Sequence, residues 1–279
     1  LFSPDIALVS AIGRHLTTVR GKRARPTLVL LCSMLGEPDQ ASVVKVAAAV
    51  ELIHTATLLH DDSIDRSHLR RGLPTINTLW NDQVSVIMGD HLFCSAFRLL
   101  HDAGLHEIAS VFSRGSDRLT WGEMFQMDLR GRMDVDEETD TEMIRLKTAA
   151  LFVASCEAGS LAGGLTPDQM QKLSEYGEHI GIAFQMIDDV LDLSRIDAGH
   201  MMLSREWTSL QEIVEEAVLA VSALFESKHL YLKIEMPSDL PRVFCDSTRV
   251  RQVILNLLSN AARFTDRGGV TVEVAQVEE

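Results

Sequence analysis

Residues 51–72 read ELIHTATLLHDDSIDRSHLRRG, an apolar run with helical periodicity that ends in three aspartates and then becomes basic. Asp61 and Asp65 lie four residues apart, so a helix places them on one face, with Asp62 beside them. Carboxylates crowded in this way repel one another unless a cation lies between them, and aspartate oxygens suit Mg²⁺. The stretch therefore predicts a helix that ends at a metal site.

Two arginines, Arg70 and Arg71, follow the aspartates. A guanidinium can bind two phosphate oxygens at once, and Mg²⁺ is commonly held by a few carboxylates together with substrate phosphates. We therefore expect a diphosphate bridged by Mg²⁺. The simpler alternative is a solvated helix end followed by a basic loop, because charge runs are usually exposed to solvent.

A second aspartate cluster, FQMIDDVLDL at residues 184–193, repeats this spacing at the end of another apolar helical stretch. It contains Asp188, Asp189 and Asp192. Two such clusters facing each other across a helical cavity would hold the metal ions of one diphosphate from both sides. A solvated loop does not explain the repetition.

Residues 1 to about 193 resemble the trans-polyprenyl diphosphate synthases of the isoprenoid synthase family. The motifs that carry the resemblance stand in the order typical of the family: GKRARP (21–26), LLHDDSID with RRGLPT, GDHLF (89–93), KTAALF (147–152) and FQMIDDVLD. The resemblance implies an all-α helical bundle. It also implies a Mg²⁺-dependent transferase that condenses isopentenyl diphosphate with an allylic diphosphate to give a long-chain polyprenyl diphosphate.

The resemblance also implies roles for individual residues. The metal ligands would be Asp61, Asp62, Asp65, Asp188, Asp189 and Asp192. Isopentenyl diphosphate would be bound by Lys22, Arg25, His54 and Arg71. The allylic diphosphate would be bound by Arg70, Lys147 and Thr148, and Gln185 would also bind substrate. Catalysis would depend on Asp61, Asp65, Arg70, Lys147 and Asp188, which stabilise the departing diphosphate.

Product length is expected to depend on Thr57 and Ala56, which lie four and five residues before Asp61. A growing hydrocarbon tail would run past them, and a bulky aromatic residue here would form a floor. Because both side chains are small, likeness to the family predicts a long-chain product rather than a farnesyl one. A terpene cyclase would share the first aspartate motif, but it would need no basic site for isopentenyl diphosphate.

Composition limits the other possibilities. The chain has 279 residues, 46% of them hydrophobic and 24% charged, which predicts one large globular domain or two ordinary ones. A formal net charge of −14 argues against nucleic acid as a partner. The four cysteines have no CxxC spacing, so neither a zinc site nor a disulfide framework is expected. Scattered cysteines of this kind predict a cytoplasmic location.

Membrane insertion is not expected, because no uninterrupted apolar run reaches ~18 residues and the amino end lacks a secretory signal. Only the lipid product would associate with a membrane. The chain begins at Leu1 rather than Met, which indicates a fragment. The family resemblance implies a homodimer.

The family pattern stops after Asp192. A prenyl synthase would continue through several more helices, so the bundle is expected to be truncated at its C-terminal end, with reduced stability and activity. Residues from about 189 to 279 instead resemble part of a sensor histidine kinase, on the strings DVLDLSRIDAG and VILNLLSNAARFT. In that resemblance Asn256 and Asn260 would face Mg-ATP.

Two domains are therefore expected: a synthase-like helical domain at 1–193 and a partial α/β kinase-like ATP-binding segment at 194–279. In the second, periodicity predicts helices at 207–227 and 248–263 and strands at 231–236 and 270–274. The sequence lacks the phosphoacceptor histidine and glycine-rich boxes of a complete kinase. The alternative to an active synthase is therefore a catalytically inactive chimera or a kinase-derived nucleotide-binding or signalling fragment.

Overall fold

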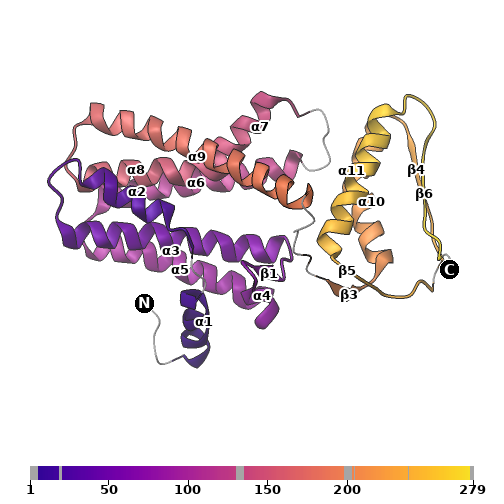
Figure 1. The fold of residues 1–279 in the computed structure, drawn as a ribbon, viewed down its shortest axis with the longest axis horizontal. Helices are drawn as coiled ribbons and strands as arrows, with labels where there is room; N and C mark the ends of the chain where they lie inside the picture. Colours follow the sequence, from indigo (N-terminus) through magenta and orange to yellow (C-terminus); the bar gives the residue numbers. More distant parts are fainter. Residues whose placement is uncertain are drawn as a thin grey trace. The chain divides into compact units, whose positions relative to one another are not determined.

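A computed structural model describes residues 6–18, 21–129, 135–197, 203, 205–237 and 239–276, without the side chains of 192, 193 and 195–197. The chain divides into two compact units (Figure 1). The first consists of Leu1–Phe125 with Glu138–Ala198, and the second of Gln126–Glu137 with Gly199–Glu279.

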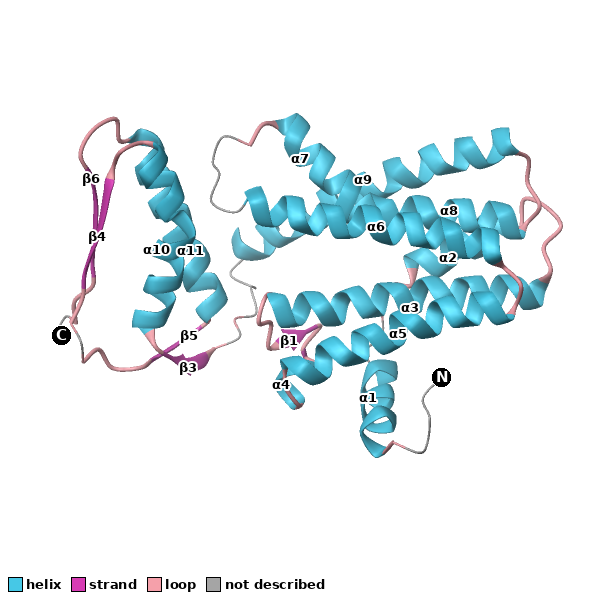
Figure 2. Cartoon of the chain, turned by 180° about the vertical axis from the view of Figure 1, so that it is seen from behind, coloured by secondary structure: helices cyan, strands magenta, loops and turns pink. Residues whose placement is uncertain are grey.

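The described part of the first unit is built from helices and one short hairpin, as Figure 2 shows. The elements are α1 (Ala7–Thr18), α2 (Ala24–Ser33), α3 (Gln40–Ile64), β1 (Leu69–Arg70), β2 (Leu73–Pro74), α4 (Ile76–Leu79), α5 (Asp82–Asp102), α6 (His106–Leu129), α7 (Glu137–Ile144), the π-helix η1 (Arg145–Ala149), α8 (Ala150–Ala162) and α9 (Pro167–Asp197). The helical bundle predicted from the sequence is therefore confirmed.

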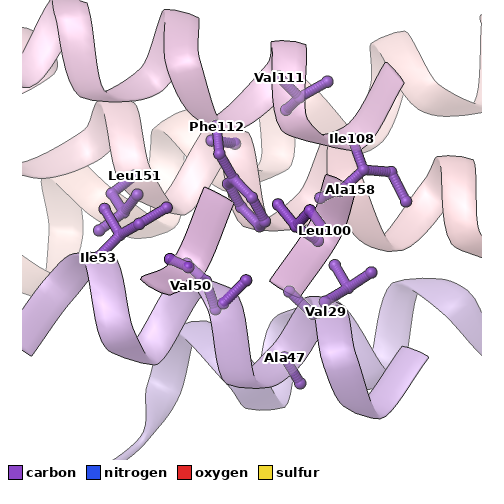
Figure 3. Packing of buried hydrophobic residues seen from close by; sticks show 14 of the residues in the cluster. Val29, Ala47, Val50, Ile53, Leu100, Ile108, Val111, Phe112, Leu151 and Ala158 are labelled. Carbon is purple, nitrogen blue, oxygen red and sulfur yellow. The ribbon is translucent and has the colours of Figure 1, made fainter. Parts of the chain in front are cut away.

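Helix α3 is the central element of this unit. Asp39 caps its amino end by accepting a 3.0 Å hydrogen bond from the Ser42 N–H. The helix packs against α2, α5 and α8, and Val50 and Ile53 on it are fully buried. Figure 3 shows Phe112 of α6 pointing into this cluster. Among the described helices, only α3 is long and apolar enough to cross a membrane, and its packing is that of a core helix.

Helix α9 begins with a capping box. Pro167 occupies its first position, the Thr166 N–H donates to Gln169 Oε1 at 2.9 Å, and the Gln169 N–H donates back to Thr166 Oγ1 at 3.4 Å. The helix then continues to Asp197. The second aspartate cluster therefore lies inside a helix, and its predicted place at a helix end was wrong.

The β1–β2 hairpin has a two-residue loop, Arg71–Gly72, between the paired residues Arg70 and Leu73. Both loop residues have positive φ, 54° at Arg71 and 78° at Gly72, as a type I′ turn requires. This left-handed conformation is unusual for arginine and is typical of strained functional sites. The sequence analysis did not predict this hairpin.

The second unit contains β3 (Glu206–Thr208), α10 (Leu210–Ser227), β4 (Tyr231–Glu235), β5 (Val243–Cys245), α11 (Ser247–Phe264) and β6 (Gly269–Glu273). Strands β4 and β6 pair in parallel, and β3 and β5 pair antiparallel. A separate core forms between α10, α11 and the parallel pair, with Val221, Phe225 and Leu258 at its centre. Trp207 lies in β3 and not in the predicted helix, because Ser209 caps α10 through the Glu212 N–H.

Candidate active site

A cavity of about 1140 Å³ lies in the first unit. Helix α3 supplies one wall through His54, Thr57 and Asp61, and α9 supplies Asp188. The expected site residues that line it are Lys22, Arg25, His54, Thr57, Asp61, Asp62, Arg70, Arg71, Lys147, Thr148, Gln185 and Asp188. Residues from both aspartate clusters and all the expected basic residues therefore share one hollow.

Three expected site residues with described side chains do not line this hollow. Asp65 caps the end of α3 and Asp189 follows Asp188, but neither lines the cavity. The side chain of Asp192 lies outside the described residues. Ala56 is fully buried in a core cluster with Leu59 and Ile76 and does not line the cavity, so its role in setting product length stays a prediction.

Helix geometry explains why Thr57 and Ala56 lie in different surroundings. At ~100° per residue, Thr57 projects about 40° from the direction of Asp61, whereas Ala56 projects about 140° away. Thr57 therefore faces the cavity with Asp61, while Ala56 faces the core. His54, two turns before Asp61, lines the cavity as its spacing predicted.

Asp61 carries an under-compensated negative charge. Burial, followed by repulsion from Glu123, raises the pKa of its carboxyl to about 6, although Lys147 and Arg70 act in the opposite direction. A carboxylate at the carboxyl end of a helix is further disfavoured by the helix dipole. A cation bound beside Asp61 would stabilise the ionised form of its carboxyl.

Asp62 has a different role. Its two carboxylate oxygens each accept a 2.9 Å hydrogen bond from Arg70 Nε, and Arg70 Nη2 lies 2.8 Å from Oδ1. Asp62 is only 3% exposed, and burial raises the pKa of its carboxyl despite the arginine. Asn77 of α4 also donates to the Asp62 carbonyl of α3 at 3.2 Å. Asp62 therefore positions Arg70.

Arg25 and His54 form a partly buried pair. Arg25 Nη1 donates to His54 Nε2 at 3.1 Å, and the guanidinium stacks 4.5 Å from the centre of the Phe152 ring. Burial lowers the pKa of Arg25 to about 10, and burial together with the nearby arginines holds the pKa of His54 well below 6.5. Because a guanidinium only donates, Nε2 is the acceptor and the neutral imidazole carries its proton on Nδ1.

Two further basic residues face the cavity from loops. Lys22 Nζ lies 3.6 Å from Asp188 Oδ1 and 5.0 Å from the centre of the Phe184 ring. Arg71 lies beside Gly21, where a Cβ would come within 2.6 Å of the guanidinium Nη1. Gly21 therefore leaves the space that Arg71 occupies. These positions agree with the predicted anion site.

Residues expected to bind the allylic diphosphate lie on and around η1. Lys147 Nζ lies 2.8 Å from Glu123 Oε1, while Thr148 Oγ1 donates to Gln185 Oε1 at 2.9 Å. Gln185 Nε2 then donates to Asp189 Oδ1 at 2.9 Å. Short π-helical turns are frequent at functional sites, and this one supplies two cavity residues in succession.

Glu123 is a cavity residue that the sequence reasoning missed. Its signal in the sequence is weak. It is a single acid between Leu119 and Phe125, directly after the helix-interior Gly122.

The cavity contains oxygen donors that a metal ion could use. Among the described side chains, no group of three or more His, Cys, Asp or Glu residues lies close enough to hold a metal alone. Asp62 is occupied by Arg70, but Asp61 and Asp188 both line the cavity. Mg²⁺ commonly uses one or two carboxylates and completes its shell with water and substrate phosphates. Together with the raised pKa of Asp61, this donor set fits such an ion.

Comparison with known proteins gives a consistent result. The family described as Polyprenyl synthetase matches residues 6–199. The chain is 39% identical over 191 residues to an all-trans-nonaprenyl-diphosphate synthase (geranyl-diphosphate specific) of Rhodobacter capsulatus, covering 68% of this chain and 58% of that protein. It is 38% identical over 269 residues to heptaprenyl diphosphate synthase component 2 of Geobacillus stearothermophilus, covering 91% of this chain and 84% of that protein.

A solved structure is also similar. The polyprenyl synthase from Caulobacter crescentus CB15, complexed with calcium and isoprenyl diphosphate, matches with a TM-score of 0.67 and 30% identity over 94% of this chain and 79% of its own. The chain spans 56% to 58% of the length of several curated relatives.

The histidine-kinase part expected after residue 189 finds no support, because prenyl synthases match 91% and 94% of the chain. The strings that suggested it are short, and helix and strand periodicities of this kind occur in many folds. The motifs, the shared cavity and the comparisons agree for the first unit. The chain belongs to the polyprenyl synthetase family.

Proposed function

We propose that the chain is a trans-prenyltransferase that condenses isopentenyl diphosphate with an allylic diphosphate to form a longer polyprenyl diphosphate. The observation that carries the proposal is the shared cavity, in which Asp61 and Asp188 lie with the basic residues of two anion sites. We assign the chemistry to the first unit, because every residue that lines the cavity belongs to it. A terpene cyclase would not need the second anion site.

Isopentenyl diphosphate is bound on the side of Lys22, Arg25 and Arg71. Three cationic side chains that line one cavity suit a diphosphate, and arginine adds bidentate geometry. His54 stays neutral beside them, so it orients Arg25 without adding a further positive charge. These residues hold the nucleophilic double bond in place.

The allylic diphosphate is bound on the side of Lys147, Thr148 and Arg70. Asp61 and Asp188 would hold Mg²⁺, which neutralises the charge that develops on the leaving diphosphate when bound. The carbon–oxygen bond of the allylic substrate breaks, and the double bond of isopentenyl diphosphate attacks the allylic carbon. A proton is then lost to the departing diphosphate, and the chain is one isoprene unit longer.

Two residues bear on selectivity. Thr57 lies one turn before Asp61 on the cavity face and is small enough for a hydrocarbon tail to pass, which supports a product longer than farnesyl diphosphate. The apolar lining residue Leu119, one turn before Glu123 on α6, helps to exclude water that would quench the cation.

Nucleotide binding by the second unit has less support. Asn256 and Asn260 lie on the exposed side of α11, four residues apart. The comparisons match this part of the chain to prenyl synthases.

The direct test is incorporation of labelled isopentenyl diphosphate into products in the presence of an allylic diphosphate and Mg²⁺, followed by chromatography. Wild-type protein is expected to give elongated polyprenyl products, and Asp61→Ala or removal of Mg²⁺ by chelation is expected to abolish them. Asp140→Ala, on α7 and away from the cavity lining, is the control and should retain turnover. Elongation that persists in Asp61→Ala, or that the wild type never shows, would overturn the proposal.

A further inference from the structure

Glu123 and Lys147 form a shielded ion pair in the wall of the cavity. The Lys147 ammonium lies 2.8 Å from Glu123 Oε1 and 3.0 Å from Oε2, with side-chain exposures of 29% for the lysine and 20% for the glutamate. Partly buried charges are screened less by salt than surface charges. The ion pair therefore restricts the conformations of the Lys147 side chain more than an exposed pair would.

The backbone around this pair is closely packed. Gly122 lies directly against η1, where an added Cβ would stand 2.5 Å from the Lys147 amide nitrogen. Only glycine allows α6 to approach the π-helical turn so closely. Glu123, the next residue on α6, is thereby brought beside Lys147 although the two are 24 residues apart in sequence.

The Lys147 ammonium can bind a phosphate while it stays paired with Glu123. An ammonium group has three donors, so it can bond to a carboxylate and to a phosphate oxygen at the same time. Its four-carbon stem is flexible, and ordering such a side chain on binding costs about 0.5–1.5 kcal/mol. A partner that orders the stem before the substrate arrives removes that cost from substrate binding.

We infer that Glu123 is a positioning residue for the allylic diphosphate: it holds the Lys147 ammonium at the cavity wall with a donor directed to the substrate. The inference rests on the proposed prenyl transfer and deepens it by assigning a role to a residue that the sequence analysis did not name. The opposite role is that of a competitor, in which Glu123 withholds Lys147 from the phosphates. If Glu123 positions Lys147, removing its charge weakens diphosphate binding. If Glu123 competes for Lys147, removing its charge strengthens diphosphate binding.

The test uses Glu123→Gln, which keeps the shape of the side chain and removes its charge. Inorganic pyrophosphate is titrated calorimetrically in the presence of Mg²⁺, and KM is measured for both substrates. We expect the pyrophosphate Kd and the KM for the allylic diphosphate to rise about 3- to 10-fold, the factor that corresponds to ordering one lysine side chain. The KM for isopentenyl diphosphate should change less than twofold.

Glu142→Gln is the matched control, because Glu142 pairs with Arg145 at 3.4 Å on the exposed side of the adjoining helix. It should leave all three constants unchanged. A second variant, Lys147→Met, completes a double-mutant cycle: adding Glu123→Gln to it should have no further effect. The double variant also leaves no unpaired ammonium, so it remains informative if Glu123→Gln alone folds poorly.

Three results would overturn the positioning role. Glu123→Gln could leave the pyrophosphate Kd unchanged, or it could lower that Kd. It could also raise the Kd as much in the Lys147→Met background as in the wild type. Wild-type protein that elongates while Glu123→Gln leaves the constants unchanged refutes only this role. Wild-type protein that binds pyrophosphate and never elongates refutes the proposed function instead.

Discussion

Gly122→Ala is expected to impair catalysis more than it impairs folding. The new Cβ would lie 2.5 Å from the Lys147 amide nitrogen, and ordinary contact begins at 3.4 Å, so α6 and η1 must separate by about 3.4 − 2.5 = 0.9 Å. The obstructing atom is backbone, so no side chain can rotate out of the way. A displacement of about 1 Å at a positioned catalytic group can lower turnover by roughly 100-fold.

The expected change in stability is smaller because two effects oppose each other. Overpacking a core costs about 1–3 kcal/mol, whereas replacing glycine by alanine inside a helix gains about 1 kcal/mol. The free energy of unfolding should therefore fall by about 0–2 kcal/mol. Urea unfolding measures this change, and single-turnover elongation measures the catalytic loss.

Gly115→Ala is the matched control on the same helix. Its Cβ would lie 2.8 Å from the Ala154 Cβ, a shortfall of about 3.4 − 2.8 = 0.6 Å, in the core and away from the cavity lining. It should lower stability by a similar amount with turnover nearly intact. Equal turnover in the Gly122→Ala and Gly115→Ala variants would refute the link between α6 packing and the placement of Lys147.

Two other substitutions test the basic side of the site. Asp62→Asn removes the charge that holds Arg70, whose side chain is 35% exposed. The substitution should lower the free energy of unfolding, measured by urea titration, by about 2 kcal/mol. A loss below about 0.5 kcal/mol would contradict the role of Asp62 in positioning Arg70. His54→Gln tests protonation: because the pKa of His54 is held well below 6.5, the wild type should lose stability as pH falls below 6.5, by up to about 1.4 kcal/mol per pH unit. The His54→Gln variant should not show this loss of stability below pH 6.5. Identical profiles of unfolding free energy against pH in the wild type and the variant would contradict the role of His54.

The sequence predicted the parts of the site that depend on spacing within one helix. His54, Thr57 and Asp61 share a face because their separations match the helical repeat, and the structure confirms that all three line the cavity. Asp188 was predicted in the same way from its own helix. The meeting of α3 and α9 came from the motif order and the family resemblance.

Contacts between distant segments were not predictable from such patterns. The pairing of Glu123 with Lys147 depends on how closely Gly122 lets α6 approach η1, which no local periodicity encodes. Asp62 was predicted to bind a metal, and no spacing in the sequence indicates that Arg70 donates to both of its oxygens. Tertiary packing decided both roles.

The most direct measurement is calorimetric titration of inorganic pyrophosphate, in the presence of Mg²⁺, into wild-type protein and the Asp61→Asn, Asp188→Asn and doubly substituted variants. If both aspartate-bearing helices act on one diphosphate through shared metal, each single substitution should weaken binding by at least tenfold. The double substitution should add little, since either loss dismantles the same site. Full affinity in either single variant, or losses that add independently, would show that the two carboxylates do not serve one diphosphate.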